Sequence, residues 1–334
     1  MKEINIPLGT QLVYSSDMDM RGVKLIGKSG IASQSDSSQS RILLKGNASL
    51  VIDSQTIIKG MTIEREGAKT TPDGLVGYVG SAIKPYAGSI VSDVVIKECN
   101  IFGFDVGIDG SSEMNKGRFH LENINFDCRT PLKLRNVLDT CYFSNLHQYP
   151  FLGNAVVGGN YNARRGSFIE LLGNVDWLQL TNCFSHSTEN YIKGKGLTGT
   201  IVGGGYDFEC YGKGIGTGIE INNDDRASGV KIIGVEFNGG HCHIRANQQG
   251  NTRLFIVNGC HFKNAGWGYF DIIRGNGNIS GCTYEQKTGQ LDWIGQIQND
   301  SDVVVGSAIY PKTKLGVWAN IGTGKVLESP YLVK

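Results

Sequence analysis

Short apolar segments recur along the chain, each followed by one polar or small residue and then by another apolar residue. The second apolar position aligns over ten segments: Met61, Cys99, Ile124, Cys141, Tyr161, Cys183, Tyr206, Val235, Cys260 and Cys282. The residue before it is Gly or Asn in eight of the ten. Gly and Asn tolerate the left-handed backbone conformation that turns a strand through a corner without a loop. The column therefore predicts a row of corners, with Cys99, Cys141, Cys183, Cys260 and Cys282 reduced and packed inward.

A second series of strands follows further along each repeat, beginning near Val106, Leu132, Phe168, Tyr191, Gly218, His241 and Tyr269. Alternation with a period of two places Ile192, Ile221, Ile244 and Ile272 inside the protein. We name this series the first strands, those before each corner the second strands, and those after it the third strands. Three short strands per repeat of about 22 residues predict an all-β fold, a right-handed parallel β-helix of about ten coils.

The repeat also predicts the organisation of the chain. Residues 1–60 are expected to form irregular N-terminal coils and a cap, residues 61–290 the β-helix body, and residues 291–334 closing or trimerisation strands. The last segment retains apolar residues after the repeat ends, among them Trp293, Trp318 and Val326. Because the open end of a β-helix exposes unpaired strand edges, this segment predicts a homotrimer contact.

Composition excludes several classes of partner and site. Charged residues make up 19% of the sequence and the net charge is +1, without a run of basic residues, so neither nucleic acid nor a membrane surface is expected as a partner. The 47 glycines and 7 prolines suit a fold with many tight turns. The eight cysteines form no CxxC pair, which predicts buried thiols and neither a metal site nor another cofactor. The first residues lack the apolar run of a signal peptide, so synthesis in the host cytoplasm is expected.

The outward positions of the first strands form a polar stripe. It comprises Glu170, Tyr191, Lys193, Glu220, Asn222, His243, Arg245 and Asp271. A solvated surface explains such a stripe equally well. The adjoining loops contain Tyr211, Trp267 and Tyr269, and aromatic rings that stack on sugars favour a glycan groove.

Two sets of carboxylates are candidates for catalysis. Glu170, Glu220 and Asp271 are predicted two rungs apart, roughly 9 to 10 Å between backbones, a spacing that suits an inverting glycosidase. The alternative set lies on the third strands, where Asp207, Glu209 and Glu236 precede His261 on neighbouring rungs. Substrate contacts are expected from Lys193, His243, Arg245, Glu209 and the aromatic residues. The cations leave open a lyase reaction on a uronate.

The corner residues and the cysteine column resemble those of the pectate-lyase-like right-handed β-helix superfamily over about residues 20–290. The opening GVKLIGKSG resembles the first coils of bacteriophage tailspikes. This resemblance implies a homotrimer of the virion tail, attached to other tail proteins, that recognises and usually depolymerises bacterial capsule or O-antigen. A non-catalytic adhesin is the alternative. A calcium-dependent pectate lyase would need ligands such as Asn222, Asn223, Asp224 and Asp225, which a turn explains better.

Overall fold

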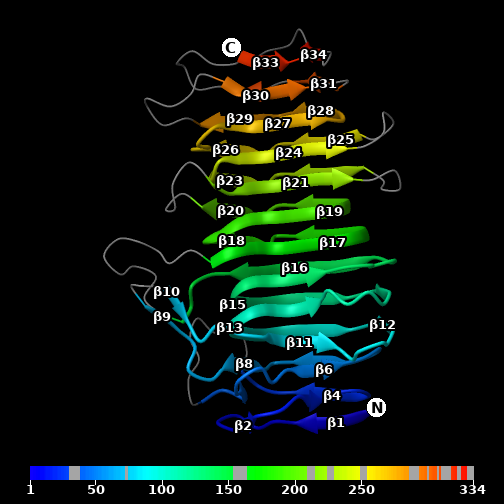
Figure 1. The fold of residues 1–334 in the computed structure, drawn as a ribbon, viewed down its shortest axis with the longest axis vertical. Coiled ribbons are helices and arrows are strands. Elements are labelled where there is room, and N and C mark those ends of the chain that lie inside the picture. The colour runs from blue at the N-terminus through cyan, green and yellow to red at the C-terminus, as the bar shows by residue number, and fades with distance from the viewer. Residues whose placement is uncertain are drawn as a thin grey trace.

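The computed structural model shows a single stack of parallel β-strands that runs from the N-terminus at one end to the C-terminus at the other (Figure 1). The described residues are 1–29, 38–71, 74–152, 164–208, 215–223, 229–248, 254–285, 293–298, 301–306, 308–309, 317–321 and 325–328. They contain strands, turns and bends and no helix, so none of them forms a helix able to cross a membrane. The predicted parallel β-helix is confirmed.

Three parallel ladders make the walls of the stack. The first-strand ladder joins β3 (Met18–Asp19), β6 (Leu50–Ile52), β11 (Ser81–Pro85), β13 (Val95–Gly110), β15 (His120–Leu134), β17 (Arg164–Thr181), β19 (Thr188–Val202), β21 (Thr217–Asn223), β24 (Cys242–Gln248), β27 (Gly268–Arg274), β30 (Trp293–Gln298) and β33 (Val317–Ile321).

The long strands β13, β15, β17 and β19 bend at corners and take part in more than one ladder. With them, the second-strand ladder joins β1 (Lys2–Asn5), β4 (Val23–Ile26), β7 (Ile57–Lys59), β16 (Cys141–Gln148), β22 (Val230–Ile233), β25 (Leu254–Asn258), β28 (Asn276–Ser280), β31 (Asp302–Val305) and β34 (Lys325–Glu328).

The third-strand ladder joins β13, β15 and β16 to β2 (Gln11–Tyr14), β5 (Arg41–Leu44), β8 (Thr62–Arg65), β18 (Phe184–His186), β20 (Gly205–Phe208), β23 (Glu236–Gly239), β26 (His261–Lys263), β29 (Cys282–Glu285) and β32 (Ala308–Ile309). Two small sheets lie outside the ladders: the hairpin of β9 (Lys69–Thr71) and β10 (Gly74–Val76), and the pair β12 (Val91–Ser92) and β14 (Lys116–Gly117).

The stack is longer than the repeat predicted, because strands before residue 61 and after residue 290 also form rungs of these ladders. The division into coils and cap, body and closing strands stays a prediction, as does the trimer contact.

Left-handed residues turn the second strands into the third strands, as the sequence predicts. Their φ angles lie between 50° and 65°, and they are Gly60, Glu98, Asn123, Asn145, Asn182, Gly203, Gly234, Gly259 and Gly281. Two predicted corners are misplaced: Asn145 rather than Thr140 turns its coil, and Gly203 rather than Gly205 turns another. The segment around Tyr161 lies outside the described residues, and the ladder passes directly from β16 to β18.

The interior is filled by the inward column predicted from the repeat. Cys99, Cys141, Cys183, Cys260 and Cys282 are all buried and free, which confirms their inward position. Cys141 lies outside the column of the other four, because it pairs in register with Leu178 of the second-strand ladder, and Leu146 takes the corresponding position in the column of Cys183. Further along the stack, Phe262 stacks between Phe237 and Tyr284 at centroid distances of 5.3 and 5.5 Å.

Candidate functional site

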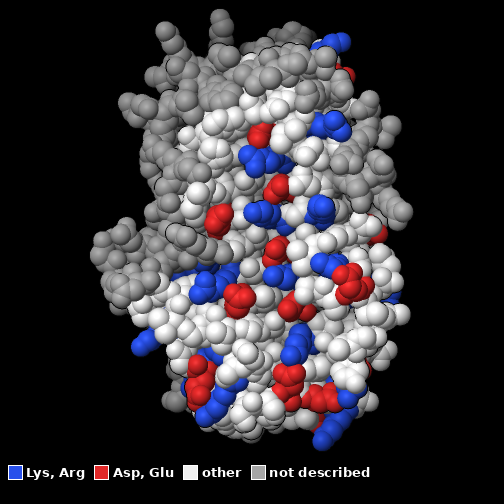
Figure 2. All heavy atoms as spheres, viewed as in Figure 1, with Lys and Arg blue, Asp and Glu red and all other residues white. Residues whose placement is uncertain are grey.

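The outward stripe predicted on the first strands is a continuous column of alternating charge. Register places each member opposite the next on adjacent rungs, in the order Lys84, Asp109, Lys133, Glu170, Lys193, Glu220, Arg245, Asp271 and Gln296. Figure 2 shows this column of alternating blue and red along the face. Glu170, Glu220 and Asp271 are therefore two rungs apart, as predicted.

A second outward row runs parallel to this column, at the end of the turn from the third strands. It carries Asp105, Arg129, Glu189, His241 and Trp267, with Gly166 and Gly216 at intervening rungs. A Cβ at Gly166 would lie 2.3 Å from the carbonyl oxygen of Arg129. These two glycines allow the backbones to stack closely and leave open space between the side chains of the row.

Small polar residues lie between the two rows. Thr130, Ser167, Asn190 and Thr217 are only 5 to 8% exposed and follow one another on consecutive rungs. The side chain of Asn190 donates to Ser167 Oγ (3.4 Å) and accepts from the backbone N–H of Thr217 (3.1 Å). These hydrogen bonds fix the row as a polar floor.

Two adjoining hollows follow this floor and together form one groove, which we call the axial groove. One hollow of about 320 Å³ extends from Asp105 to Lys193, and the other of about 390 Å³ from Glu189 to Arg245. They share Glu189, Asn190 and Lys193, so the groove crosses six rungs, or ~24 Å at the spacing of paired strands.

Charge in the axial groove is balanced. Its acidic residues are Asp105, Glu170, Glu189 and Glu220, and its basic residues are Arg129, Lys133, Lys193 and Arg245. Lys133 Nζ lies 3.1 Å from Glu170, and Arg129 Nε lies 3.7 Å from Asp105. Glu220 accepts a hydrogen bond from Asn222 and lies on the rung between Lys193 and Arg245.

Asp271 differs from the other two predicted carboxylates. Its side chain is only 7% exposed, accepts from Arg245 Nε (2.9 Å) and Gln296 Nε2 (2.8 Å), and lies beyond the residues that line the groove. Its surroundings favour a structural ion pair at the end of the column.

Three predicted substrate contacts are wrong, because the side chains face the interior. Tyr191 is fully buried, stacks on Phe168 and donates its hydroxyl to the carbonyl of Cys183 (2.8 Å). His243 is also fully buried, and Tyr269 donates its hydroxyl to the carbonyl of Glu285 (2.8 Å). Burial lowers the pKa of His243 to about 3, so the ring is neutral at physiological pH.

Trp267 is half-buried and stacks on His241 with ring centroids 5.7 Å apart, at the C-terminal end of the groove. Lys193 and Arg245 line the groove as predicted. Tyr211 and Glu209 lie outside the described residues. Sequence reasoning missed Glu189, Asp105 and His241, because they precede the first strands in segments without alternation.

The alternative carboxylates on the third strands surround a smaller hollow of about 160 Å³. Asp207 and Glu236 both line it, together with Asn238. Glu236 is paired with Lys263 at 2.8 Å, and the predicted neighbour of Glu236 on the next rung, His261, is confirmed by register. Its volume is at most half that of either hollow of the axial groove.

No protein-family model matches the sequence, and no curated protein matches it. Among solved structures, the gp42 tailspike of an Acinetobacter phage is 10% identical, with a TM-score of 0.54 over 93% of this chain and 58% of that one. Tailspike protein 3 of bacteriophage CBA120 is 10% identical, with a TM-score of 0.39 over 100% and 55% of the two chains. The catalytic unit of a Streptomyces thermodiastaticus α-1,3-glucanase is 10% identical, with a TM-score of 0.36 over 97% and 62%.

The chain thus spans little more than half the length of the Acinetobacter phage tailspike. At this identity the likeness concerns the fold. The chain has a tailspike-like parallel β-helix fold, as its repeat predicts.

Proposed function

We propose that this protein binds bacterial surface polysaccharide in the axial groove and cleaves it internally as a glycoside hydrolase, acting as the β-helix part of a homotrimeric phage tailspike. The observation that carries the proposal is the groove itself, a polar channel along the stack with three carboxylates around Lys193. Its length, ~24 Å, suits an extended polymer rather than a small molecule. Its small polar floor offers hydroxyl and amide groups to sugar hydroxyls.

Glu220 is the central catalytic candidate of this proposal. Glu170 lies two rungs away on the same wall, and Glu189 lies on the rung between them in the opposite row. An inverting glycosidase needs an acid and a base ~6.5 to 9.5 Å apart, with room for a water beside the scissile bond. The backbones of Glu220 and Glu170 are two rungs, or ~10 Å, apart, which is compatible with such a pair, and Glu189 is a second possible partner of Glu220. Lys193 between them would hold a sugar hydroxyl in register.

Charge compensation supports hydrolysis rather than elimination. A lyase acting on a uronate needs cationic groups that neutralise the substrate carboxylate. Lys133, Lys193 and Arg245 each lie between two carboxylates of the column. The groove therefore favours a polysaccharide without net charge, whose binding would change little between low and high salt.

The proposal is tested by incubating the protein with purified capsular and O-antigen polysaccharides and measuring new reducing ends and absorbance at 235 nm. We expect reducing ends without the absorbance of an unsaturated product. Glu220→Gln should lower kcat ~10²-fold or more, the usual scale for general acid or base catalysis. Glu170→Gln should also lower kcat, and Glu122→Gln is its matched control, because Glu122 is 33% exposed and paired with Lys97 on the second-strand ladder.

A binding-only adhesin is the second candidate, favoured by the ion pairs that hold Glu170 and Asp271. It predicts retention of the polysaccharide without new reducing ends. If Asp207→Asn or Glu236→Gln abolishes activity while Glu220→Gln remains active, the catalytic site lies on the third-strand face instead.

A further inference from the structure

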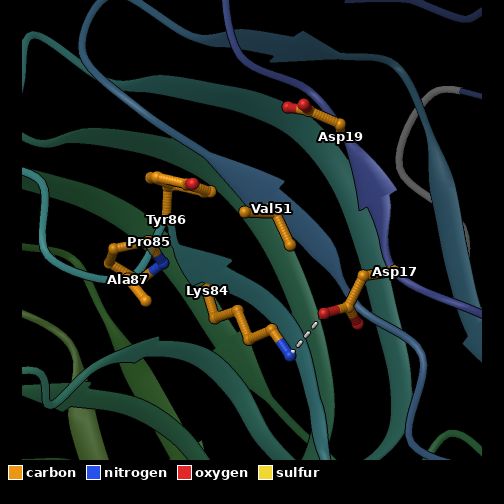
Figure 3. A pocket seen from close by; sticks show the side chains of 7 residues that line it. All are labelled: Asp17, Asp19, Val51, Lys84, Pro85, Tyr86 and Ala87. Atoms are coloured by element: carbon orange, nitrogen blue, oxygen red, sulfur yellow. Dashed lines mark ion pairs between the residues drawn. The ribbon is translucent and has the colours of Figure 1, made fainter.

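A separate hollow of about 500 Å³ lies near the N-terminal end of the stack, outside the axial groove. It is lined by Asp17, Asp19, Val51, Lys84, Pro85, Tyr86 and Ala87, whose side chains are shown in Figure 3. They come from β3, β6 and β11 and the segments beside them, the first three rungs of the first-strand ladder.

Register places this hollow at the N-terminal end of the charged column and on the side of the column away from the groove. Its lining continues from Lys84 to Ala87, whereas the groove is lined by residues that precede the column, such as Asp105. Asp19 lies opposite Val51, Val51 opposite Lys84, and Lys84 begins the charged column of Figure 2. Strand β13, which carries Asp105 at the near end of the groove, is the next rung after β11, ~5 Å away at the spacing of paired strands. An extended polymer that leaves the groove toward the N-terminal end and crosses the column near Lys84 would therefore reach the hollow.

The lining combines an apolar surface with fixed acceptors. Val51, Pro85, Ala87 and the ring of Tyr86 supply the apolar part, and Tyr86 is 43% exposed. The guanidinium of Arg21 lies 3.9 Å from the centroid of the Tyr86 ring and holds it in place from one side.

Both carboxylates are oriented by other groups. Asp17 lies 2.9 Å from Lys84 Nζ, drawn as the dashed line in Figure 3, and accepts the backbone N–H of Ser49. Asp19 accepts hydrogen bonds from Nε and Nη2 of the Arg21 side chain and from the Arg21 backbone N–H, which lower its pKa to about 2. Both side chains are about half exposed, so their free lone pairs can accept sugar hydroxyls.

We propose that this hollow, which we call the N-terminal pocket, is a non-catalytic binding site for a sugar unit of the same polysaccharide chain that occupies the axial groove. This inference rests on the proposed function of the groove. The apolar face of a neutral pyranose packs on Tyr86 and Pro85, while its hydroxyls donate to Asp17 and Asp19. Since both carboxylates are paired with cations, the pocket holds the polymer without cleaving it.

The pocket makes binding depend on the length of the glycan. From Lys84 to Glu220 the column crosses five rung intervals, ~24 Å, so only a chain that spans this distance occupies both sites. Two linked contacts raise the affinity for such a chain, whereas a short oligosaccharide in the groove gains nothing.

The test measures binding in the Glu220→Gln background, so that the polymer stays intact. The probes are a purified O-antigen or capsular polysaccharide that the wild type cleaves or retains, and oligosaccharides of it too short to span ~24 Å. Tyr86→Ala should weaken binding of the polymer by about tenfold, equivalent to about 1.4 kcal/mol, and leave oligosaccharide binding unchanged. Asp17→Asn should act in the same direction. Tyr142→Ala, which removes a 53% exposed tyrosine from the second-strand ladder, should change neither.

If Tyr86→Ala leaves the affinity for the polymer unchanged, or weakens polymer and oligosaccharide binding equally, the proposed binding role of the N-terminal pocket is wrong. Neither result would contradict the proposed function of the axial groove. Failure of the proposed function is distinct, because the wild type would then neither cleave nor retain any polysaccharide tested. Thermal unfolding of each variant separates loss of binding from loss of folding.

Discussion

Replacement of His243 by Phe is expected to make the protein more resistant to acid without changing its activity at neutral pH. His243 is fully buried between the rings of Phe237, Phe262 and Tyr269, at centroid distances of 5.4 to 5.7 Å. One ring nitrogen, Nε2, donates to the carbonyl of Gly239 at 2.9 Å. The other, Nδ1, lacks a hydrogen-bond partner within the described part of the chain.

The magnitude follows from the pKa of His243, which burial lowers from 6.5 to about 3. Below pH 6.5 the unfolded chain binds a proton that the folded protein does not, so the free energy of unfolding falls as the pH falls. The loss is about 1.4 kcal/mol per pH unit, or about 3 kcal/mol at pH 4.5 and about 4 kcal/mol at pH 3. Above pH 6.5 His243 is neutral in both the folded and the unfolded protein, so it causes no loss of stability there.

Urea unfolding of the wild type and His243→Phe at pH 8, 6, 5 and 4.5 measures the effect. The other titrating groups are common to both proteins, so their contributions cancel in the difference between the two free energies of unfolding. At pH 8 the variant loses the hydrogen bond to Gly239, at a cost of about 1 kcal/mol. Toward pH 4.5 it should become the more stable protein. Phe143→Leu, a buried position on the second-strand ladder away from His243, is the control, with a cost independent of pH. If the free energies of unfolding of the wild type and His243→Phe fall in parallel as the pH is lowered, His243 is not buried in its neutral form and the reasoning is refuted.

Three further outcomes follow from the buried groups. Asp127→Ala should lower the free energy of unfolding by about 3 to 5 kcal/mol, because it leaves the fully buried Arg164 charge unpaired, and Asp127→Leu with Arg164→Met should recover much of the loss in chemical denaturation. Tyr191→Phe should cost only about 1 kcal/mol and leave kcat unchanged, since its hydroxyl bonds the backbone inside the core. In a Cys210→Ser variant, the remaining thiols should react with Ellman's reagent only after denaturation, because all seven are buried.

The fold was predictable because each coil repeats the same local solution. A left-handed residue needs no long-range information: Gly60, Asn123, Asn182 and Gly259 identify their corners by residue type alone. Glu98 shows the limit, since its φ of 53° is imposed by its place in the ladder rather than favoured by its side chain. Asn145 was missed because Cys141, four residues earlier, resembles the inward cysteine that follows other corners.

The charged wall of the site was predictable for a similar reason. Parallel pairing in register converts Glu170, Lys193, Glu220 and Arg245, which are 23 to 27 residues apart, into neighbours. The opposite wall was not predictable, because Glu189 enters the groove from the turn between third and first strands. No alternation of polar and apolar residues marks the direction of a side chain there.

The groove and the errors of the sequence interpretation have one origin, a break in strand alternation at the start of the first strands. Tyr191 and Ile192 are consecutive and both buried, as are His243 and Ile244. In a regular strand one of each pair would face solvent, which is why Tyr191 and His243 were expected in the stripe. Two successive inward residues instead tilt the outward residues on either side, such as Asn190 and Lys193, toward a common hollow. Repeated on successive rungs, this break accounts for a channel parallel to the axis of the stack. A residue that restored simple alternation at Tyr191 would therefore disturb both the core and the floor of the groove.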